Sequence, residues 1–189
     1  MITVIDYGAG NIFSLTNALK SLGFEFRITD SGFTGAEKII LPGVGHFSSM
    51  MRSLEDRELV ESIKNATATG VPFLGICLGM QALFESSEEA PGIPGLCLLK
   101  GKVVRLPETS RVPHMGWNEV SFTDGSKDWF YFANSFVVSE SQDIWGKADH
   151  DGEFVAAVKH ENLTGMQFHP EKSGQAGLDL LEKWCRNAS

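Results

Sequence analysis

The stretch Val71-Pro72-Phe73-Leu74-Gly75-Ile76-Cys77-Leu78-Gly79 decides how the rest of the chain is interpreted. It begins as a short apolar run, which predicts a buried strand, and continues without a linker into an apolar helical pattern. Cys77 stands at the junction, two residues after one glycine and two residues before another. A Cβ atom at either glycine would collide with the strand or the helix of such a sharp turn. The stretch therefore predicts an α/β fold with a nucleophile at the end of a buried strand.

Apolar runs and helical patterns alternate on the N-terminal side of this turn. Gly23 ends the first helical pattern, and Pro42 ends the strand that precedes the second. The expected elements are strands over 2–6, 24–28 and 38–42 and helices over 12–22 and 54–69. Buried strands that alternate with helices indicate a parallel sheet covered by helices. We therefore expect a flavodoxin-like, mostly parallel central sheet flanked by helices.

The pattern changes after Ser87, where shorter alternating runs are separated by polar or glycine-rich turns. Such runs predict an added region of antiparallel strands in the C-terminal half. The runs cover 102–106, 119–122, 129–138, 153–160 and 163–168, and a short closing helix follows over 177–184. Because no repeat, low-complexity tract or linker divides the chain, we expect residues 1–189 to form a single domain.

The charge and cysteine content argue against several classes of partner. The 189 residues include 16 basic and 24 acidic side chains, which give a net charge of −8. Nucleic acids and anionic membranes both attract clustered positive charge, so we expect neither as a partner. Three cysteines in a chain of this length do not indicate a disulfide scaffold, and the N-terminus lacks a signal-peptide pattern. We expect a cytoplasmic protein that takes a neutral substrate or a protein partner.

Cys77 has the surroundings of a catalytic thiol. The start of a helix supplies partial positive charge and free N–H groups, which favour the thiolate that attacks carbonyl carbon. The N–H of Leu78 is the first free donor after the nucleophile, so it is well placed to stabilise an oxyanion. A buried structural cysteine is the alternative interpretation. It fits Cys97 and Cys185, because neither lies at such a turn.

A base for this thiol is available in His169-Pro170-Glu171. Pro170 stiffens the link, and residues two apart on an extended loop can point to the same side. Glu171 could therefore hold the His169 ring and stabilise its protonated form. We predict that Cys77, His169 and Glu171 are the catalytic residues.

Pro42-Gly43-Val44-Gly45 ends a second central strand. Ligands of α/β sheets bind at the carboxyl ends of parallel strands. A plain tight turn is one interpretation of this segment. The other is a backbone edge beside Cys77 that gives a second oxyanion N–H and contacts a small polar substrate, with Gly43 and Gly45 in the binding site.

Together these residues strongly resemble the class I, or triad-type, glutamine amidotransferase family. The matching patterns are Pro-Gly-X-Gly, Gly-Ile-Cys-Leu-Gly-Met-Gln and Gln-Phe-His-Pro-Glu. Within the family, the chain is similar to the glutaminase subunits of imidazole glycerol phosphate synthase, and the likeness spans essentially its whole length. The segments that carry this second likeness are 6–11, 41–47, 77–81 with Glu88-Glu89, and 112–118.

The resemblance implies a role for each site residue. Cys77 would be the nucleophile, His169 the base and Glu171 the residue that orients the base. The backbone N–H groups of Leu78 and Val44 would be the oxyanion donors.

The resemblance also implies how glutamine is held. The backbone of Gly45 and the side chain of Gln81 would contact it, and the carboxylate of Glu89 would bind its α-ammonium group. The backbone of Asn134, Ser135 and Phe136 would face its carboxylate end. The family usually has His-Ser-Tyr at these three positions, so the side chains at 134 and 136 depart from its pattern.

The reaction implied by the family is hydrolysis of L-glutamine to glutamate through a γ-glutamyl thioester. The ammonia would pass to a (β/α)₈-barrel cyclase subunit, which makes imidazole glycerol phosphate and aminoimidazole carboxamide ribotide in histidine biosynthesis. The resemblance implies a heterodimer with this partner and places Asn11, Trp117 and Tyr131 near its face. We expect no metal and no cofactor. The sequence has no phosphate-binding glycine loop, basic cluster or nucleotide motif, so the second substrate should bind elsewhere.

Val44 suggests that activity depends on the partner, since most triad amidotransferases have glycine at this position. Turning the Val44 N–H into an oxyanion hole changes φ of Val44, and a β-branched residue resists unusual φ values. The loss of one such donor lowers the rate roughly 10²–10³-fold. We therefore expect the isolated subunit to be a poor glutaminase.

Three other functions are compatible with parts of this pattern. The first is a paralogous glutaminase that feeds ammonia to a different synthase, such as a surface-sugar amidotransferase. The second is a thiol hydrolase or redox protein of the same architecture, which would have no use for Gln81 and Glu89. The third is a non-catalytic scaffold, against which the intact triad argues.

Overall fold

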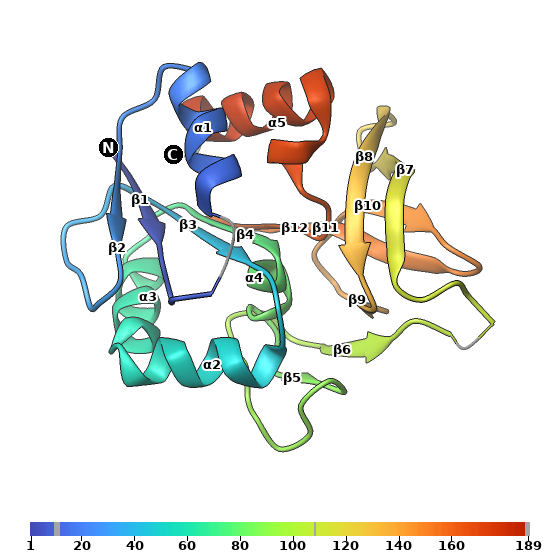
Figure 1. The fold of residues 1–189 in the computed structure, drawn as a ribbon, viewed down its shortest axis with the longest axis horizontal. Coiled ribbons are helices and arrows are strands. Elements are labelled where there is room, and N and C mark those ends of the chain that lie inside the picture. Colours follow the sequence, from blue (N-terminus) through green and yellow to red (C-terminus); the bar gives the residue numbers. More distant parts are fainter. Residues whose placement is uncertain (10–11, 108, 188–189) are drawn as a thin grey trace.

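The computed structural model describes residues 1–9, 12–107 and 109–187, and its central strands form one mixed sheet (Figure 1). The parallel half of the sheet comprises, in spatial order, β2 (Phe26–Thr29), β1 (Ile2–Ile5), β3 (Lys38–Gly43), β4 (Phe73–Cys77) and β12 (Leu163–Met166). Each neighbouring pair in this half is parallel, so the carboxyl ends meet at one edge. This edge brings together Gly43, Cys77 and the chain that follows Met166.

The C-terminal half continues the same sheet with antiparallel strands. In spatial order they are β11 (Glu153–His160), β10 (Ile144–Asp149), β7 (His114–Phe122) and β8 (Lys127–Asn134). The short strands β5 (Ser86–Ser87), β6 (Lys102–Arg105) and β9 (Phe136–Val138) lie beside this path. The predicted fold class, a mostly parallel central sheet flanked by helices with an antiparallel C-terminal region, is confirmed.

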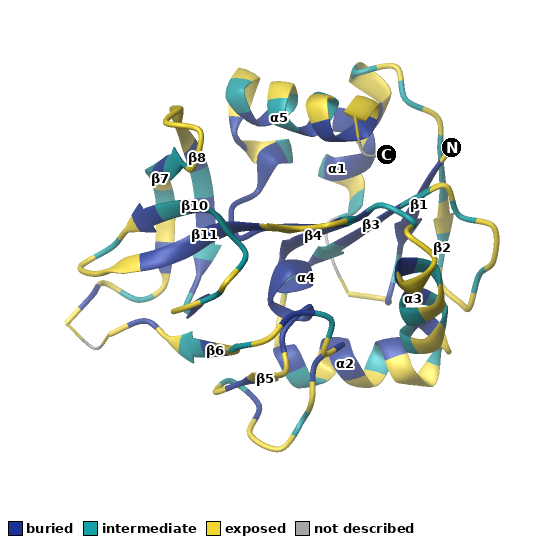
Figure 2. Cartoon of the chain, turned by 180° about the vertical axis from the view of Figure 1, so that it is seen from behind, coloured by how far each residue is buried: buried dark blue, intermediate teal, exposed yellow. Residues whose placement is uncertain are grey.

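Helices cover both faces of the parallel half. Figures 1 and 2 place α1 (Ile12–Ser21) and α5 (Gly174–Asn187) on one face and α2 (Phe47–Asp56) and α3 (Leu59–Ala68) on the other. Leu15 and Leu181 accordingly belong to one buried cluster, whereas Met50 and Ile63 belong to a second. The strands between these layers are largely buried (Figure 2). None of the helices in the described ranges is long and apolar enough to cross a membrane.

The single helix predicted over 54–69 was wrong, because two helices occupy this region. α2 ends at Asp56 and α3 begins at Leu59. Between them Glu58 adopts a left-handed backbone with φ of 59°, a conformation that the sequence would normally mark with glycine or asparagine. α2 also begins earlier than predicted, at Phe47. Its serines have weak helix propensity, so it lacks a strong sequence signal.

The other differences concern how strands divide and pair. The predicted run over 129–138 is divided at Ser135 into β8 and β9, and β10 and the first half of β7 were not predicted. The run over 163–168 yields β12, which is antiparallel to β11 but parallel to β4. β12 therefore joins the two halves, and this position depends on long-range pairing rather than on local pattern. The helix after Cys77 is one turn long, α4 (Leu78–Gln81), and α5 extends beyond the predicted 177–184 at both ends.

Backbone segments pack against one another at the turn that follows β4. A Cβ atom on Gly75 would lie 2.4 Å from the Gly79 carbonyl oxygen, and one on Gly79 would lie 1.9 Å from the Leu41 carbonyl oxygen. A Cβ atom on Gly43 would lie 2.5 Å from the Gly79 nitrogen. The steric role predicted for the glycines that flank Cys77 is therefore confirmed. α4 can reach the ends of β3 and β4 only because these three residues lack side chains.

We predict that Gly79→Ala destabilises the protein by about 1–3 kcal/mol or more, because the new methyl group overlaps backbone that cannot rotate away. Urea unfolding followed by circular dichroism measures the change. Gly32→Ala is the matched control, since the nearest atom to its new methyl group would be the Ser62 hydroxyl oxygen, at 3.1 Å, which needs to shift by much less than the backbone around Gly79. The control should change stability by no more than about 0.5 kcal/mol. Equal stability of the two variants would contradict the packing described here.

Candidate active site

A cavity of about 290 Å³ opens beside Cys77 at the carboxyl edge of the parallel strands. Ten of the predicted site residues line it: Val44, Gly45, Cys77, Leu78, Gln81, Glu89, Asn134, Ser135, Phe136 and His169. Pro113, Ala133 and Lys172 complete the described lining. Gly43 was predicted to contact substrate, but it packs against Leu78 and Gly79 and is not part of this lining.

Cys77 occupies the strained position at the apex of the turn. Its backbone has φ of 54° and ψ of −111°, a region that non-glycine residues rarely adopt. Its side chain faces the cavity, although only 5% of the residue is exposed. Leu78 begins α4 directly afterwards, so its N–H belongs to the first helical turn and has no partner within the helix.

His169 reaches Cys77 because β12 lies beside β4 in parallel register, with Met166 paired to Ile76. One side of the His169 ring interacts with the Cys77 side chain, and both residues line the cavity. On its other side, Nδ1 lies 2.9 Å from Oε1 of Glu171. The predicted triad residues are thus adjacent in the order thiol, imidazole and carboxylate. The link between His169 and Glu171 is, however, a 3₁₀ turn over Pro170–Lys172 and not the extended loop expected from the sequence.

The His169 ring is held in its charged form. Burial alone would lower the pKa of His169, but hydrogen bonds and charge interactions with Cys77 and Glu171 outweigh burial and raise the pKa to about 10. The His169 and Glu171 side chains are both nearly inaccessible to solvent, which keeps their interaction unscreened. The site therefore holds a charged imidazole ring between the sulfur of Cys77 and the carboxyl group of Glu171.

Strand β8 fixes the backbone of His169. The His169 N–H donates to the Tyr131 carbonyl at 2.9 Å, and the Tyr131 N–H donates to the Ser173 hydroxyl at 2.9 Å. The Ser173 hydroxyl in turn donates to the His169 carbonyl at 2.6 Å. Tyr131 was predicted near a partner face, and in the structure its main chain positions His169.

Two buried amides connect the Phe136 carbonyl to the sulfur of Cys77. Gln81 Nε2 donates to the Phe136 carbonyl and to Gln167 Oε1, both at 2.9 Å. Gln167 is fully buried, and its Nε2 lies 3.6 Å from the Cys77 sulfur. Gln167 was not among the predicted site residues, although its place two residues before His169 is a usable signal. Because both N–H bonds of the Gln81 amide are engaged, its oxygen is the group that can contact a substrate.

The unusual residues at 134 and 136 support this wall of the cavity. Asn134 Nδ2 donates to the Phe136 carbonyl at 3.1 Å, alongside the donation from Gln81. The Ser135 carbonyl accepts from the Leu106 N–H at 3.0 Å. Both carbonyls are thus occupied, so the N–H groups of this segment are the ones suited to a substrate carboxylate.

Two other predicted residues already have partners. Glu89 Oε2 accepts from the Phe47 N–H at the start of α2, at 2.8 Å, which leaves Oε1 for a ligand. The Val44 N–H donates to the Tyr7 hydroxyl at 2.9 Å. Trp117 is 52% exposed and packs edge-on against Tyr131, whereas Asn11 lies outside the described residues.

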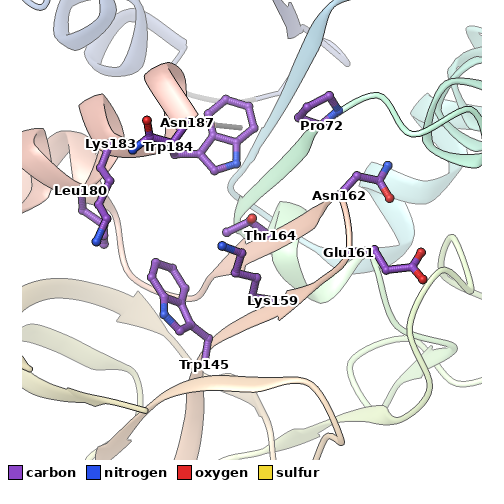
Figure 3. Close-up of a pocket in the computed structure, with 10 residues that line it drawn as sticks. All are labelled: Pro72, Trp145, Lys159, Glu161, Asn162, Thr164, Leu180, Lys183, Trp184 and Asn187. Carbon is purple, nitrogen blue, oxygen red and sulfur yellow. The ribbon is translucent and has the colours of Figure 1, made fainter. Parts of the chain in front are cut away.

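A second cavity, of about 170 Å³, lies at the opposite end of β4 and β12 (Figure 3). Trp145, Lys159 and Thr164 approach it from the strands, and Lys183 and Trp184 approach it from α5 (Figure 3). Its described lining includes neither cysteine nor histidine, so it does not repeat the pairing of thiol and imidazole found beside Cys77.

We predict that Glu171→Gln lowers the pKa of His169 from about 10 towards its ordinary value of 6.5, because the variant removes a buried negative charge. The raised pKa of His169 contributes to the stability of the folded state. This contribution is fully present below pH 6.5 and is lost as the pH rises towards 10. The variant should therefore lose stability at pH 6.5 but little at pH 10. NMR titration of the His169 ring and urea unfolding at both pH values measure these effects. Glu182→Gln, which removes a surface partner of Arg186, is the control, and an identical His169 titration in both variants would contradict this assignment.

Comparison with known proteins agrees with this geometry. Residues 3–188 match the family described as glutamine amidotransferase class-I. The chain is 41% identical to the imidazole glycerol phosphate synthase subunit HisH of Methanothermobacter thermautotrophicus, over 97% of each chain. It is 44% identical to the subunit of the same name from Thermococcus kodakarensis, over 98% of this chain and 100% of that one. A solved glutamine amidotransferase has the same fold, with a TM-score of 0.81 and 17% sequence identity over 97% of both chains. The structure of PurLQS from Thermotoga maritima also has this fold, with a TM-score of 0.76 and 20% identity over 100% of this chain and 98% of that one. The chain belongs to the class I glutamine amidotransferase family.

Proposed function

We propose that this protein is the glutaminase subunit of an imidazole glycerol phosphate synthase, which hydrolyses L-glutamine and passes the ammonia to a synthase partner. The observation that carries the proposal is the row of Cys77, His169 and Glu171, in which Cys77 and His169 line the cavity and Glu171 holds the far side of the ring. Relatives that are 41–44% identical over nearly the whole chain bear the name of that synthase subunit. Cytoplasmic operation fits its three free cysteines.

The first half of the reaction releases ammonia. The Cys77 thiolate attacks the γ-carbonyl carbon of glutamine, and the carbonyl electron pair moves onto oxygen. The Leu78 N–H stabilises this oxyanion. The charged His169 gives its proton to the amide nitrogen, the C–N bond breaks, and ammonia leaves a γ-glutamyl thioester on Cys77.

The second half restores the enzyme. His169, now neutral, takes a proton from water as the water oxygen attacks the thioester carbon. The C–S bond then breaks, glutamate leaves, and the thiolate and the imidazolium are regenerated. Glu171 keeps the ring oriented and stabilises its charge in both halves, since it stays within hydrogen-bond distance of Nδ1.

Substrate selectivity follows from the remaining groups of the cavity. The free carboxylate oxygen of Glu89 would bind the α-ammonium group, and the N–H groups of Ser135 and Phe136 would face the α-carboxylate. The Gln81 oxygen is the third polar contact. A ligand that carries both an ammonium and a carboxylate satisfies this arrangement, which favours a free amino acid over a peptide.

The synthase partner would be a (β/α)₈-barrel cyclase subunit that forms a heterodimer with this chain. The exposed apolar side chains of Met115 and Trp117 lie together on β7, and Tyr131 pairs with Trp117 across the sheet. Exposed apolar side chains of this size are typical of a protein interface. Asn11 is proposed for the same interface from the family resemblance alone.

We predict that Cys77→Ala abolishes glutamate formation, with a loss of roughly 10⁴-fold or more, because no other thiol lines the cavity. The assay uses the subunit with its purified barrel partner and the nucleotide substrate of that partner. Supplying an ammonium salt in place of glutamine should restore formation of the partner's product, since the barrel subunit would need ammonia and its nucleotide substrate but no glutamine hydrolysis. Cys97→Ala is the control and should keep full activity. Glutamate formation by Cys77→Ala, or no glutamate formation by the wild-type complex, would overturn the proposal.

A further inference from the structure

The second cavity lies at the amino ends of β4 and β12, whereas the catalytic residues follow their carboxyl ends. Five of the side chains that line it have no part in the proposed chemistry: Trp145, Lys159, Thr164, Lys183 and Trp184. Lys159 and Thr164 are direct partners in the antiparallel pairing of β11 and β12, so their side chains stand on the same face of the sheet. α5 supplies Lys183 and Trp184 from the opposite side of the cavity (Figure 3).

A β-bulge directs Trp145 to this cavity. The pairing of β10 with β11 shifts between Ile144 and Gly146, so Trp145 is the extra residue on β10. A bulge changes the direction in which a side chain points. The Trp145 indole packs against the Phe122 ring, with 5.0 Å between ring centroids, and lines the cavity together with Lys159.

The hydroxyl group of Thr164 has no hydrogen-bond partner among the described residues. Only 5% of Thr164 is exposed, and the part of its surface that remains open lines the cavity. Buried polar groups are nearly always hydrogen-bonded, so an unpaired hydroxyl on a cavity wall indicates a place for a ligand. Figure 3 places this side chain beside Lys159.

The lysines make the cavity attractive to an anion. The Lys159 ammonium group forms no ion pair with any residue that the structure describes, and Lys183 has only a charge interaction with Asp124. Glu161 is the one acidic residue of the described lining, and its carboxylate points away from both lysines (Figure 3). Two ammonium groups and a hydroxyl can together donate to one carboxylate.

The tryptophans indicate what the rest of the ligand is. Trp184 is 8% exposed, and Trp145 packs against the same buried cluster, so both rings are held in place. Flat indole surfaces favour contact with another flat ring. A volume of about 170 Å³ is small for a ligand site and suits a molecule with a single ring. Inorganic phosphate would match the lysines but would leave the indoles without a partner.

We propose that this cavity binds a small aromatic carboxylate. Its ring packs against Trp145 and Trp184, and its carboxylate accepts hydrogen bonds from Lys159 and Thr164. The proposal does not depend on the glutaminase function, because the described linings of the two cavities have no residue in common.

Titration of the full chain with benzoate, followed by ¹⁵N NMR of the indole N–H groups, tests the proposal. We expect saturable binding with a Kd of about 1 mM or lower. The indole signals of Trp145 and Trp184 should shift, whereas those of Trp117 and Trp129 should not, because the latter two do not line the cavity. Benzamide, which has a similar shape but no charge, should bind at least about tenfold more weakly, and so should inorganic phosphate.

Two variants test the polar contacts. Thr164→Val removes the hydroxyl and keeps a β-branched side chain in the strand, and Lys159→Gln removes a charge from an exposed side chain. Each should weaken benzoate binding by roughly tenfold, since each removes a hydrogen bond to a charged group. Lys100→Gln is the matched control, because Lys100 is exposed and lies outside the described lining, and it should bind benzoate as the wild type does.

The results that would overturn the proposal are specific. They are no saturable binding up to about 10 mM benzoate, equal affinity for benzamide or phosphate, and equal shifts of all four indole signals. Unchanged benzoate affinity in Lys159→Gln would also overturn it, and this variant decides against Lys100→Gln if Thr164→Val does not fold. None of these results bears on the glutaminase function, which glutamate formation tests separately.

Discussion

The close approach of backbone segments around Cys77 is the constraint on which the site depends. Gly43, Gly75 and Gly79 have no side chains, so the short helix α4 can pack directly on the ends of β3 and β4. This contact forces the chain to reverse within one residue and places Cys77 at φ of 54°. The strain is thereby stored at Cys77, which lines the cavity, and the N–H of the next residue begins the helix. Packing and chemistry are therefore two consequences of the same glycines.

The charge interactions in the site depend on where the strands end. β12 lies parallel to β4, so the chain after it brings His169 to the thiol and Glu171 to the far side of the ring. The buried amides of Gln81 and Gln167 connect the Phe136 carbonyl on one wall of the cavity to the Cys77 sulfur. Substrate binding, thiol orientation and ring charge thus form one hydrogen-bonded system. Tyr7 adds a contact from the core, because its hydroxyl accepts a hydrogen bond from the Val44 N–H.

The sequence predicted the parts of this account that depend on local signals. The paired glycines around Cys77 and the spacing of His169 and Glu171 identified the three residues that the structure brings together. Prediction from the sequence was wrong where tertiary contacts override the local pattern. Glu58 interrupts the predicted helix although it is not glycine, and β12 lies between the two halves of the sheet. The contacts of Tyr7 and Gln167 were also beyond prediction, because they join residues that lie 37 and 90 positions apart in the chain.

The central claim is that Cys77 is the thiol that forms the γ-glutamyl bond. A chloromethyl ketone analogue of glutamine, followed by peptide mass spectrometry, tests this claim most directly. We expect stoichiometric labelling of Cys77 that free glutamine prevents, although Cys97 is the exposed cysteine and Cys77 is buried. Labelling of Cys97 or Cys185 instead, or labelling that glutamine does not prevent, would contradict it.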